Sequence, residues 1–431
     1  MIPRRARHAA LLALLALALA APPASANGRF PRAQDYVQSI ASPNLRVLRT
    51  TFGLVLSTDG GARWEFWCED AFAYTDGYDP PLAFAADGTL LVALDDGLVA
   101  TQDGCAVRRQ QDLEGLAVKD LAASADGRTV WAAVTTHDAA PSSRVARSTD
   151  NGRTFTFPGD AMEGLVLDTV ETAASDALRL YASGSRLADG TPVVLRSDDG
   201  GAHWRPAGAS FGGAHGVYVS AVDPSHADVV WLRVEGAAMD ASTSAASALF
   251  RSDDAGATAR LVWQARGPMR GVALSPDGRT VWAGGPEDGV WTSRDGATMS
   301  QLGTDPVECL RYAGGALWAC RTFVPGGALL LRGDGAGPFA TALSVADIGG
   351  PPSRCVAGTA MHDLCPGRWN GVLRTLLPAD GRDASAPADA RPTAPPATPG
   401  GCGCATRTGS VDGAPVAFLA LMAVSRRRRR R

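Results

Sequence analysis

An eight-residue pattern that recurs along the chain limits the possible folds more than any other feature of the sequence. Its shared positions are a serine, an aspartate two residues later, a glycine two residues after that and, in three copies, a closing aromatic residue. The copies are Ser57, Asp59, Gly61, Trp64; Ser148, Asp150, Gly152, Phe155; Ser197, Asp199, Gly201, Trp204; and Ser252, Asp254, Gly256. Ser and Asp side chains can hold a turn through nearby backbone N–H groups, and Gly can adopt positive φ. With an apolar run before each copy, the pattern predicts a turn between two strands.

Degenerate copies of the same turn fill the gaps between the four clear ones. They begin at Thr101, Ser293 and Arg332. The seven copies then follow one another at intervals of 39 to 55 residues. A repeat of roughly 40–50 residues with four short strands is typical of a propeller blade. The sequence therefore predicts an all-β, seven-bladed β-propeller over residues 27–378, with six or eight blades as alternatives.

The pattern S-x-D-x-G-x-x-[WF] resembles the Asp-box, or BNR repeat. That motif occurs in sialidases, sortilin-type receptors, photosystem assembly factors and xyloglucan-hydrolysing tandem propellers. The resemblance implies that the repeated turns lie on the outer side of each blade, away from the face that usually binds ligand. It thus supports an architecture and assigns the box residues a structural role.

The two ends of the chain differ from the repeat region. Residues 1–26 predict a secretory signal peptide, with a basic start, a Leu/Ala-rich run and a small-residue cleavage site ending at Ala26. Residues 379–401 are rich in Pro and Ala and predict a disordered linker. The segment from Asp347 to Pro378 either completes the last blade or closes the ring, and the sequence leaves both alternatives open.

Residues 402–431 have a composition of their own. Cys402 and Cys404 precede an apolar run from Ala414 to Val424 and six terminal arginines. This order resembles the MYXO-CTERM sorting tail of myxobacterial surface proteins, which implies delivery to the cell surface and processing near the cysteines. An apolar helix of this length spans about 17 Å, well short of a ~30 Å bilayer core. A transient sorting signal is therefore favoured over a stable membrane anchor.

The charge distribution limits the partners of the central domain. The whole chain has a net charge of −3, and its two end segments, 1–26 and 402–431, hold ten arginines against one acid, so the central part is more acidic than the whole. This argues against nucleic acid as a partner and leaves membrane contact to the tail alone. The six histidines are scattered, which disfavours a metal site. We expect a monomer without a cofactor.

The cysteine content suits an exported, disulfide-bonded chain. Cys309 and Cys320 lie at equal distances from Gly314-Gly315, so a two-residue hairpin would place them opposite each other. A second predicted pair is Cys355 with Cys365, which bracket a short loop. A third is Cys68 with Cys105, expected on the outer strands of neighbouring blades.

One connection between blades combines aromatic and acidic residues and is the candidate ligand-binding loop. The loop runs from residue 69 to 80, and its candidate contacts are Asp70, Phe72, Tyr74, Asp76, Tyr78 and Asp79. Aromatic faces with carboxylates suit a sugar, a basic peptide or Ca²⁺. The alternative is a loop whose aromatic residues simply pack on the rim of the propeller.

These features favour a cell-surface binding module for glycan or protein, with no catalytic role. One alternative is a sialidase-like glycoside hydrolase, and another is an assembly factor for an envelope complex. The early Arg-Ile-Pro signature of sialidases is missing, and Phe30-Pro31-Arg32 is a poor substitute. Other glycosidases need two carboxylates across a cleft. A hydrolase should therefore contain buried acids in the central cleft.

Overall fold

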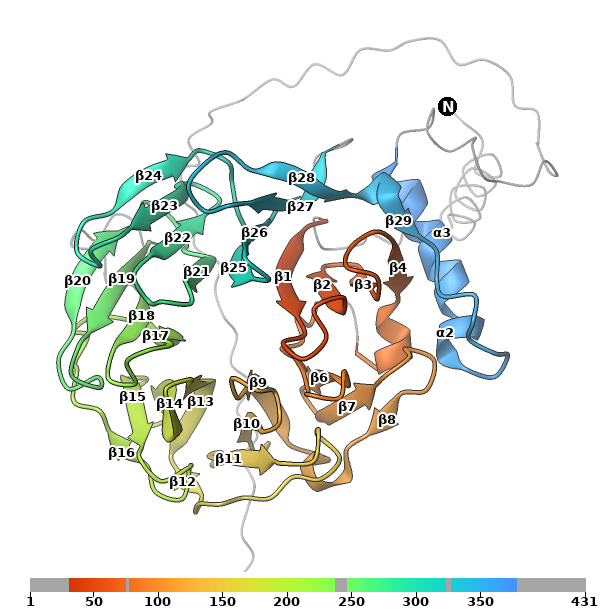
Figure 1. The fold of residues 1–431 in the computed structure, drawn as a ribbon. Coiled ribbons are helices and arrows are strands. Elements are labelled where there is room, and N and C mark those ends of the chain that lie inside the picture. Colours follow the sequence, from red (N-terminus) through yellow and green to blue (C-terminus); the bar gives the residue numbers. More distant parts are fainter. Residues whose placement is uncertain (1–30, 75–76, 237–245, 323–326, 378–431) are drawn as a thin grey trace, which may run out of the picture. The chain divides into compact units, whose positions relative to one another are not determined.

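The computed structural model describes residues 31–74, 77–236, 246–322 and 327–377, which form a ring of seven blades (Figure 1). Each blade is a sheet of four consecutive antiparallel strands, and the first sheet gains a fifth, parallel strand from the C-terminal segment. The predicted all-β, seven-bladed β-propeller is confirmed, which excludes the alternatives of six and eight blades.

The strands follow the blades in chain order. Those of blades 1 to 4 are β1 (Ala33–Gln38), β2 (Arg46–Thr50), β3 (Gly53–Ser57), β4 (Trp64–Trp67); β5 (Leu82–Phe84), β6 (Leu90–Leu94), β7 (Gly97–Thr101), β8 (Arg108–Arg109); β9 (Ala117–Ala123), β10 (Val130–Thr135), β11 (Ser142–Ser148), β12 (Met162–Glu163); and β13 (Leu165–Ala173), β14 (Asp176–Arg186), β15 (Pro192–Ser197), β16 (Arg205–Pro206). Those of blades 5 to 7 are β17 (Gly216–Val222), β18 (Val230–Glu235), β19 (Ser247–Ser252), β20 (Arg260–Gln264); β21 (Gly271–Leu274), β22 (Val281–Gly285), β23 (Gly289–Ser293), β24 (Ser300–Gly303); and β25 (Cys309–Ala313), β26 (Ala316–Cys320), β27 (Ala328–Gly333), β28 (Ala340–Ser344).

The remaining elements are short. They are η1 (Glu69–Phe72), η2 (Gln111–Leu113), η3 (Val345–Asp347), β29 (Ile348–Gly349), α2 (Ala360–Asp363) and α3 (Cys365–Leu376).

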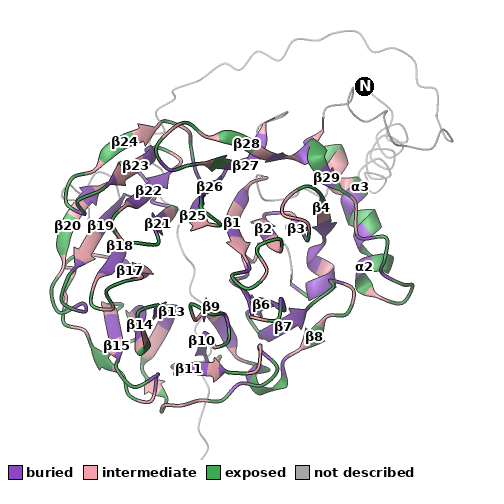
Figure 2. Ribbon diagram, viewed as in Figure 1, coloured by how far each residue is buried: buried purple, intermediate pink, exposed green. Residues whose placement is uncertain are grey.

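The middle strands of the blades are buried on both faces because each sheet packs between two neighbours (Figure 2). Every residue of β6 and β10 is buried, whereas the outermost strand β16 is exposed. A strand covered on both faces reads as a continuous apolar run rather than an alternating one. This explains why stretches such as Leu90–Leu94 lack the two-residue alternation of a half-exposed strand.

The four clear copies of the repeated turn have one hydrogen-bond pattern, and all lie between the third and fourth strands of a blade. The serine Oγ accepts the N–H of the glycine at 2.8–2.9 Å and donates to the aspartate at 2.8–3.0 Å. The aspartate accepts a backbone N–H from four residues later at 2.8–2.9 Å. Each glycine has φ between 73° and 91°, which a residue with a Cβ rarely adopts.

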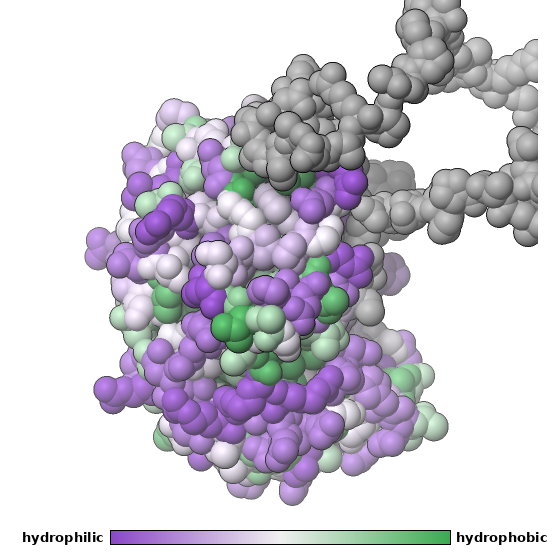
Figure 3. Space-filling view, turned by 90° about the vertical axis from the view of Figure 1, so that its right-hand side faces the viewer, coloured by the Kyte–Doolittle hydropathy of each residue, from purple (hydrophilic) through white to green (hydrophobic). Residues whose placement is uncertain are grey.

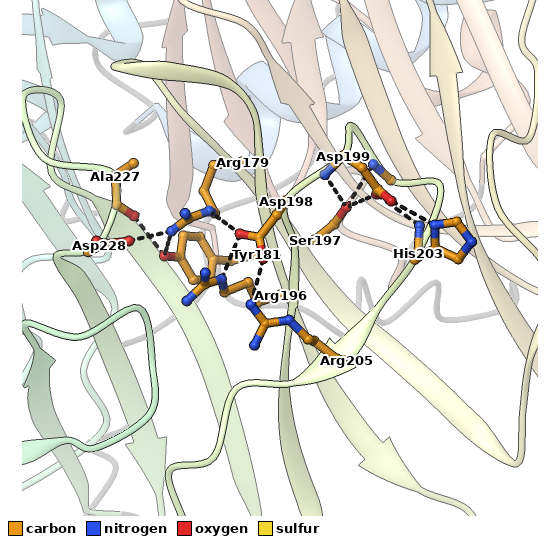
Figure 4. Close-up of polar contacts among 11 residues, drawn as sticks. Arg179, Tyr181, Arg196, Ser197, Asp198, Asp199, His203, Arg205, Ala227 and Asp228 are labelled. Carbon is orange, nitrogen blue, oxygen red and sulfur yellow. Dashed lines mark hydrogen bonds and ion pairs between the residues drawn. The ribbon is translucent and has the colours of Figure 1, made fainter.

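Ion pairs beside the turn of blade 4 reach the next blade (Figure 4). Asp198 pairs with Arg179 and Arg196 at 2.7 Å and with Arg205 at 2.6 Å. Arg179 also pairs with Asp228 of blade 5. Because Arg179 pairs with an aspartate of its own blade and with one of the next blade, the cluster links blades 4 and 5.

The C-terminal segment closes the ring from outside, and we call residues 345–377 the clasp. Blade 7 is complete at Ser344, and β29 then pairs in parallel with β4 of blade 1. Of the two alternatives for this segment, ring closure is therefore the observed one. On the inside, β1 meets blade 7 through a 3.0 Å bond from the Ala33 N–H to the Arg321 carbonyl.

The clasp is attached to blades 1 and 2 by ionic, aromatic and covalent contacts. Arg354 binds both carboxylate oxygens of Glu65 at 2.7 Å. The ring of Trp369 lies 5.0 Å from that of Phe66. On the side of the molecule that carries the clasp, the surface mixes polar residues with small apolar patches (Figure 3).

All six described cysteines form disulfides, but only one pair is the predicted one. Cys309 and Cys320 are opposite in register and bonded at 2.06 Å, which confirms that pair. The pairs Cys355–Cys365 and Cys68–Cys105 are wrong. Instead, Cys68 bonds Cys365 and Cys105 bonds Cys355. The reason is that the clasp runs along the edge of blade 1 to blade 2, so each of its cysteines meets a cysteine of the propeller.

Three disulfides indicate an extracytoplasmic protein, because such bonds persist in oxidising compartments. Within the described residues, no helix has the length and apolar character needed to span a membrane. The predicted signal peptide (1–26), linker (379–401) and sorting tail (402–431) lie outside the described residues, so these remain predictions.

The nested clasp disulfides are expected to stabilise the fold in a non-additive way. With one of them intact, the other closes only the two short segments 68–105 and 355–365. Removing one by paired Cys→Ser changes should therefore lower the free energy of unfolding by about 4 kcal/mol, and removing both should cost more than the sum. Denaturant unfolding of the two single-bridge variants and the double-bridge variant measures this difference.

The matched control removes Cys309–Cys320, which closes a separate, short loop. Its loss is expected to cost about 3 kcal/mol and to add independently to either clasp variant. Strict additivity of the two clasp disulfides would contradict the nested arrangement.

Candidate functional site in the central channel

A cavity of about 700 Å³ lies on the axis of the propeller, and we call it the central channel. It is lined by the first strands of all seven blades, which surround the centre of the ring (Figure 1). The first strands begin at the upper face, which carries the blade-to-blade connections and the loops between second and third strands. The repeated turns lie on the opposite, lower face. Channels of this size are typical of small-molecule sites.

Four charged side chains on the first strands of four different blades line the channel. They are Asp35 on β1, Asp120 on β9, Glu171 on β13 and Arg311 on β25. Arg311 Nε lies 3.1 Å from an oxygen of Asp35. Asp35 is buried, whereas 47% of the Arg311 side chain surface remains exposed in the channel. The guanidinium is thus held on one side and accessible to a ligand on the other.

β-Bulges direct the acids into the channel. The pairing register shifts by one residue at Gln34 in β1, at Lys119 in β9 and at Asp168 in β13. Each extra residue bends the strand and changes which side chains face the axis. Asp35 and Asp120 directly follow such a bulge, and Glu171 comes three residues after one.

The acids differ in their electrostatic surroundings. Burial alone would raise the pKa of Asp35, but the guanidinium groups of Arg311 and Arg49 outweigh it and hold that pKa below its usual value. Burial raises the pKa of Asp120 to about 7, although its carboxylate accepts the Val170 N–H at 2.9 Å. Asp35 is therefore ionised at neutral pH, whereas Asp120 is present in both its protonated and its ionised form.

Glu171 retains its proton more strongly than Asp120. Burial raises the pKa of Glu171 to about 8, and the nearby charge of Asp120 adds to this effect. Near pH 7 the channel therefore contains both hydrogen-bond donors and acceptors made from carboxyl groups. Such a set can bind ligand hydroxyls, and it can also supply a general acid.

The upper part of the channel adds aromatic, hydroxyl and basic groups. Thr169, Tyr218, Arg233 and Arg270 all line it. The guanidinium carbon of Arg233 lies 4.3 Å from the centre of the Tyr218 ring, and Arg233 donates to the Met269 carbonyl at 2.9 Å. Ring faces beside fixed polar groups suit a ligand that combines apolar faces with hydroxyls.

The structure divides the predicted ligand-binding loop into two halves. In the first, Asp70 pairs with Arg368 of the clasp, Phe72 is 1% exposed and stacks on Trp67, and Tyr74 is 6% exposed. These positions match the alternative in which the aromatic residues pack on the propeller.

The second half of that loop approaches the channel. Asp79 accepts a 2.7 Å bond from Gln34, a channel residue. The hydroxyl of Tyr78 donates to the Val118 carbonyl at 3.4 Å, and burial raises its pKa to about 12. Asp76 lies outside the described residues. A ligand-binding role for the loop remains a prediction.

Sequence reasoning missed the four charged residues of the first strands that line the channel. The available signal was a charged residue within the first strand of a blade, as in Ala117–Ala123, where the neighbours are mostly small or apolar. Loop acids attracted attention instead because loops usually carry function. Within the described chain, no three His, Cys, Asp or Glu side chains are arranged to hold a metal ion.

Comparison with solved structures identifies the propeller fold. An ancestral GH74 enzyme matches with a TM-score of 0.55 and 14% identity over 72% of this chain and 46% of that one. A GH74 enzyme of Niastella koreensis matches with a TM-score of 0.35 and 15% identity over 72% and 62%. Kuenenia stuttgartiensis hydrazine synthase matches with a TM-score of 0.50 and 11% identity over 70% and 96%.

These likenesses show the fold alone. The chain spans about half the length of the ancestral GH74 enzyme. No protein-family model matches the sequence, and no curated protein matches it. The propeller is thus shared with glycan-active enzymes, and its activity has to be argued from its own residues.

The raised pKa values of Asp120 and Glu171 predict that stability falls as pH increases from about 4 to about 8. The unfolded chain loses both protons near the ordinary pKa values of 3.8 and 4.5, whereas the folded chain keeps them to about 7 and about 8. Because the folded state binds more protons in this window, each group should lower the free energy of unfolding by about 1.4 kcal/mol per pH unit.

Urea unfolding at pH 5 and pH 8 measures this slope. Asp120→Asn and Glu171→Gln should each flatten it, since neither replacement can ionise. Glu163→Gln, at an exposed residue of β12, is the matched control and should leave the slope unchanged. A slope that persists in both channel variants would show that these acids are not the groups responsible.

Proposed function

We propose that this chain is an exported β-propeller that binds a glycan in its central channel without converting it. The observation that carries the proposal is the channel lining, in which Asp120, Glu171 and Arg311 face a cavity of about 700 Å³. Sugar hydroxyls need donors and acceptors at fixed positions, and rigid inner strands supply both. Tyr218 and Thr169 add a ring and a hydroxyl near the upper face.

The proposal includes the cellular setting. The repeated turns are Asp-boxes, the first 26 residues direct export, and the C-terminal tail delivers a monomeric propeller to the cell surface. The supporting observations are the hydrogen bonds repeated in four turns and the three disulfides. The fold shared with an ancestral GH74 enzyme agrees with a carbohydrate ligand.

A second candidate function is glycoside hydrolysis, and one specific observation favours it. Asp120 and Glu171 line one channel on adjacent blades, with pKa values of about 7 and about 8. A protonated carboxyl beside an ionised one is the pair that glycosidases use. We favour binding over hydrolysis because two of the channel carboxylates already have partners within the protein: Asp120 accepts the Val170 N–H, and Asp35 pairs with Arg311.

The two functions are separated by exposing the purified protein to a mixed glycan library. Mass spectrometry of the library reports new reducing ends, and retention on the immobilised protein reports binding. We expect retention without cleavage, and we expect Glu171→Gln and Thr169→Ala to weaken retention by a few-fold each. Glu163→Gln is the matched control and should bind as well as the unchanged chain.

Two results would overturn the binding proposal. Cleavage that disappears in Asp120→Asn or Glu171→Gln would establish the hydrolase instead. Retention that is unaffected by every channel substitution would place the glycan elsewhere on the propeller.

A further inference from the structure

A second cavity, of about 510 Å³, lies at the lower face where blades 7 and 1 meet. We call it the seam pocket. Its lining comes from the start of β2 and the repeated turn of blade 1, and from the hairpin between β25 and β26 and strands β26 to β28 of blade 7. It is separate from the central channel, because the two cavities have no lining residue in common.

The seam pocket exists because the packing between blades differs here. At other junctions between blades, the glycine of a turn faces the preceding blade. A β-carbon at Gly152 of blade 3 would meet Leu91 of blade 2, and one at Gly335 of blade 7 would meet Trp282 of blade 6. At Gly61, the nearest atoms belong instead to Arg46 and Trp64 of its own blade. The turn of blade 1 therefore does not fill the space beside blade 7.

The turn of blade 7 also departs from the repeat at this place. In the strand register, Gly333 pairs with Leu317 as Ser252 of a clear copy pairs with Val230, so a glycine stands at the strand position of the serine and no side chain projects there into the pocket. Within the turn, Asp334 accepts the N–H groups of Ala336 and Gly337 at 2.9 Å, and from blade 6 the indole N–H of Trp282 donates to the Gly335 carbonyl at 2.8 Å. The acidic side chain of the lining is thus bound to its own turn.

Two arginines lie over one tryptophan in the seam pocket. The guanidinium carbons of Arg46 and Arg332 are 5.1 Å and 5.5 Å from the ring centre of the buried Trp318. A guanidinium that stacks on a ring keeps its N–H groups available at the edge. The tryptophan therefore holds both cations in place for a further partner.

Neither arginine is neutralised by a nearby acid. Among the described residues, no carboxylate lies within ion-pair distance of Arg46 or Arg332. The corresponding arginines of blades 4 and 5 differ, since Arg196 pairs with Asp198 at 2.7 Å and Arg251 with Asp253 at 2.6 Å. The seam pocket thus has a net positive charge, with two arginines against the one aspartate of its lining.

We propose that the seam pocket binds an acidic sugar unit, with its carboxylate or sulfate between Arg46 and Arg332. Arginine binds oxyanions through paired N–H groups, which gives both strength and geometry. The volume of about 510 Å³ is much larger than a bare ion requires and lies in the range of small-molecule sites. This site is independent of the glycan site proposed in the channel.

Calorimetric titration of the purified chain tests the proposal. The probes are glucuronate and glucose 6-sulfate, with glucose and inorganic sulfate as comparisons. Both acidic sugars should bind and glucose should not, and affinity should fall as NaCl is added. Arg46→Gln and Arg332→Gln should each weaken binding by about tenfold or more.

Two further variants keep the test decisive if removal of an arginine disturbs the fold. Thr341→Glu places a negative charge at an exposed residue of the lining and should abolish binding with both arginines present. Arg147→Gln removes the arginine that lies 5.6 Å from the Trp131 ring in blade 3, outside the pocket, and should leave binding unchanged.

Several outcomes would overturn the proposal. They are equal binding of glucose, equal or tighter binding of inorganic sulfate, and acidic-sugar binding that survives both arginine substitutions. Glu171→Gln separates the two sites, because it alters the channel alone. If it removes acidic-sugar binding, the anion is held in the channel and the seam pocket is not the site.

Discussion

Burial of both faces of every sheet is the constraint on which the rest of this structure depends. A single four-stranded blade cannot by itself shield its apolar residues from water, so each blade needs a neighbour on both sides. Only a closed ring gives every blade two neighbours. The junction of blades 7 and 1 is therefore the place where the chain must secure the fold. The clasp crosses it by pairing β29 with β4, and two of the three disulfides then fix the clasp to blades 1 and 2.

The same constraint explains where polar groups gather. Strands near the axis cannot pack sheet against sheet, because seven of them converge around one opening. Charged residues are tolerated there when they neutralise one another, as Asp35 and Arg311 do, or when they keep a proton, as Glu171 does. The channel is thus polar for a structural reason, and any ligand site in it uses groups that the fold already holds rigidly.

Local signals in the sequence predicted local structure well. The Ser-x-Asp-x-Gly turns and the hairpin between Cys309 and Cys320 depend on residues a few positions apart, so their chemistry is readable from the sequence. The partners of Cys68 and Cys105 were not predictable, because they lie 297 and 250 residues away and meet only after the ring has closed. The channel acids were missed because bulges at Gln34, Lys119 and Asp168 decide which side chains face the axis.

The two long-range disulfides have a topological consequence for the protein outside the cell. The bond between Cys105 and Cys355 lies inside the loop closed by Cys68 and Cys365, so blades 3 to 7 belong to two concentric covalent rings. A protease that cuts one exposed loop between residues 105 and 355 opens the chain but releases no fragment. The cut propeller stays one molecule of unchanged mass, apart from the added water, until a reductant separates its parts.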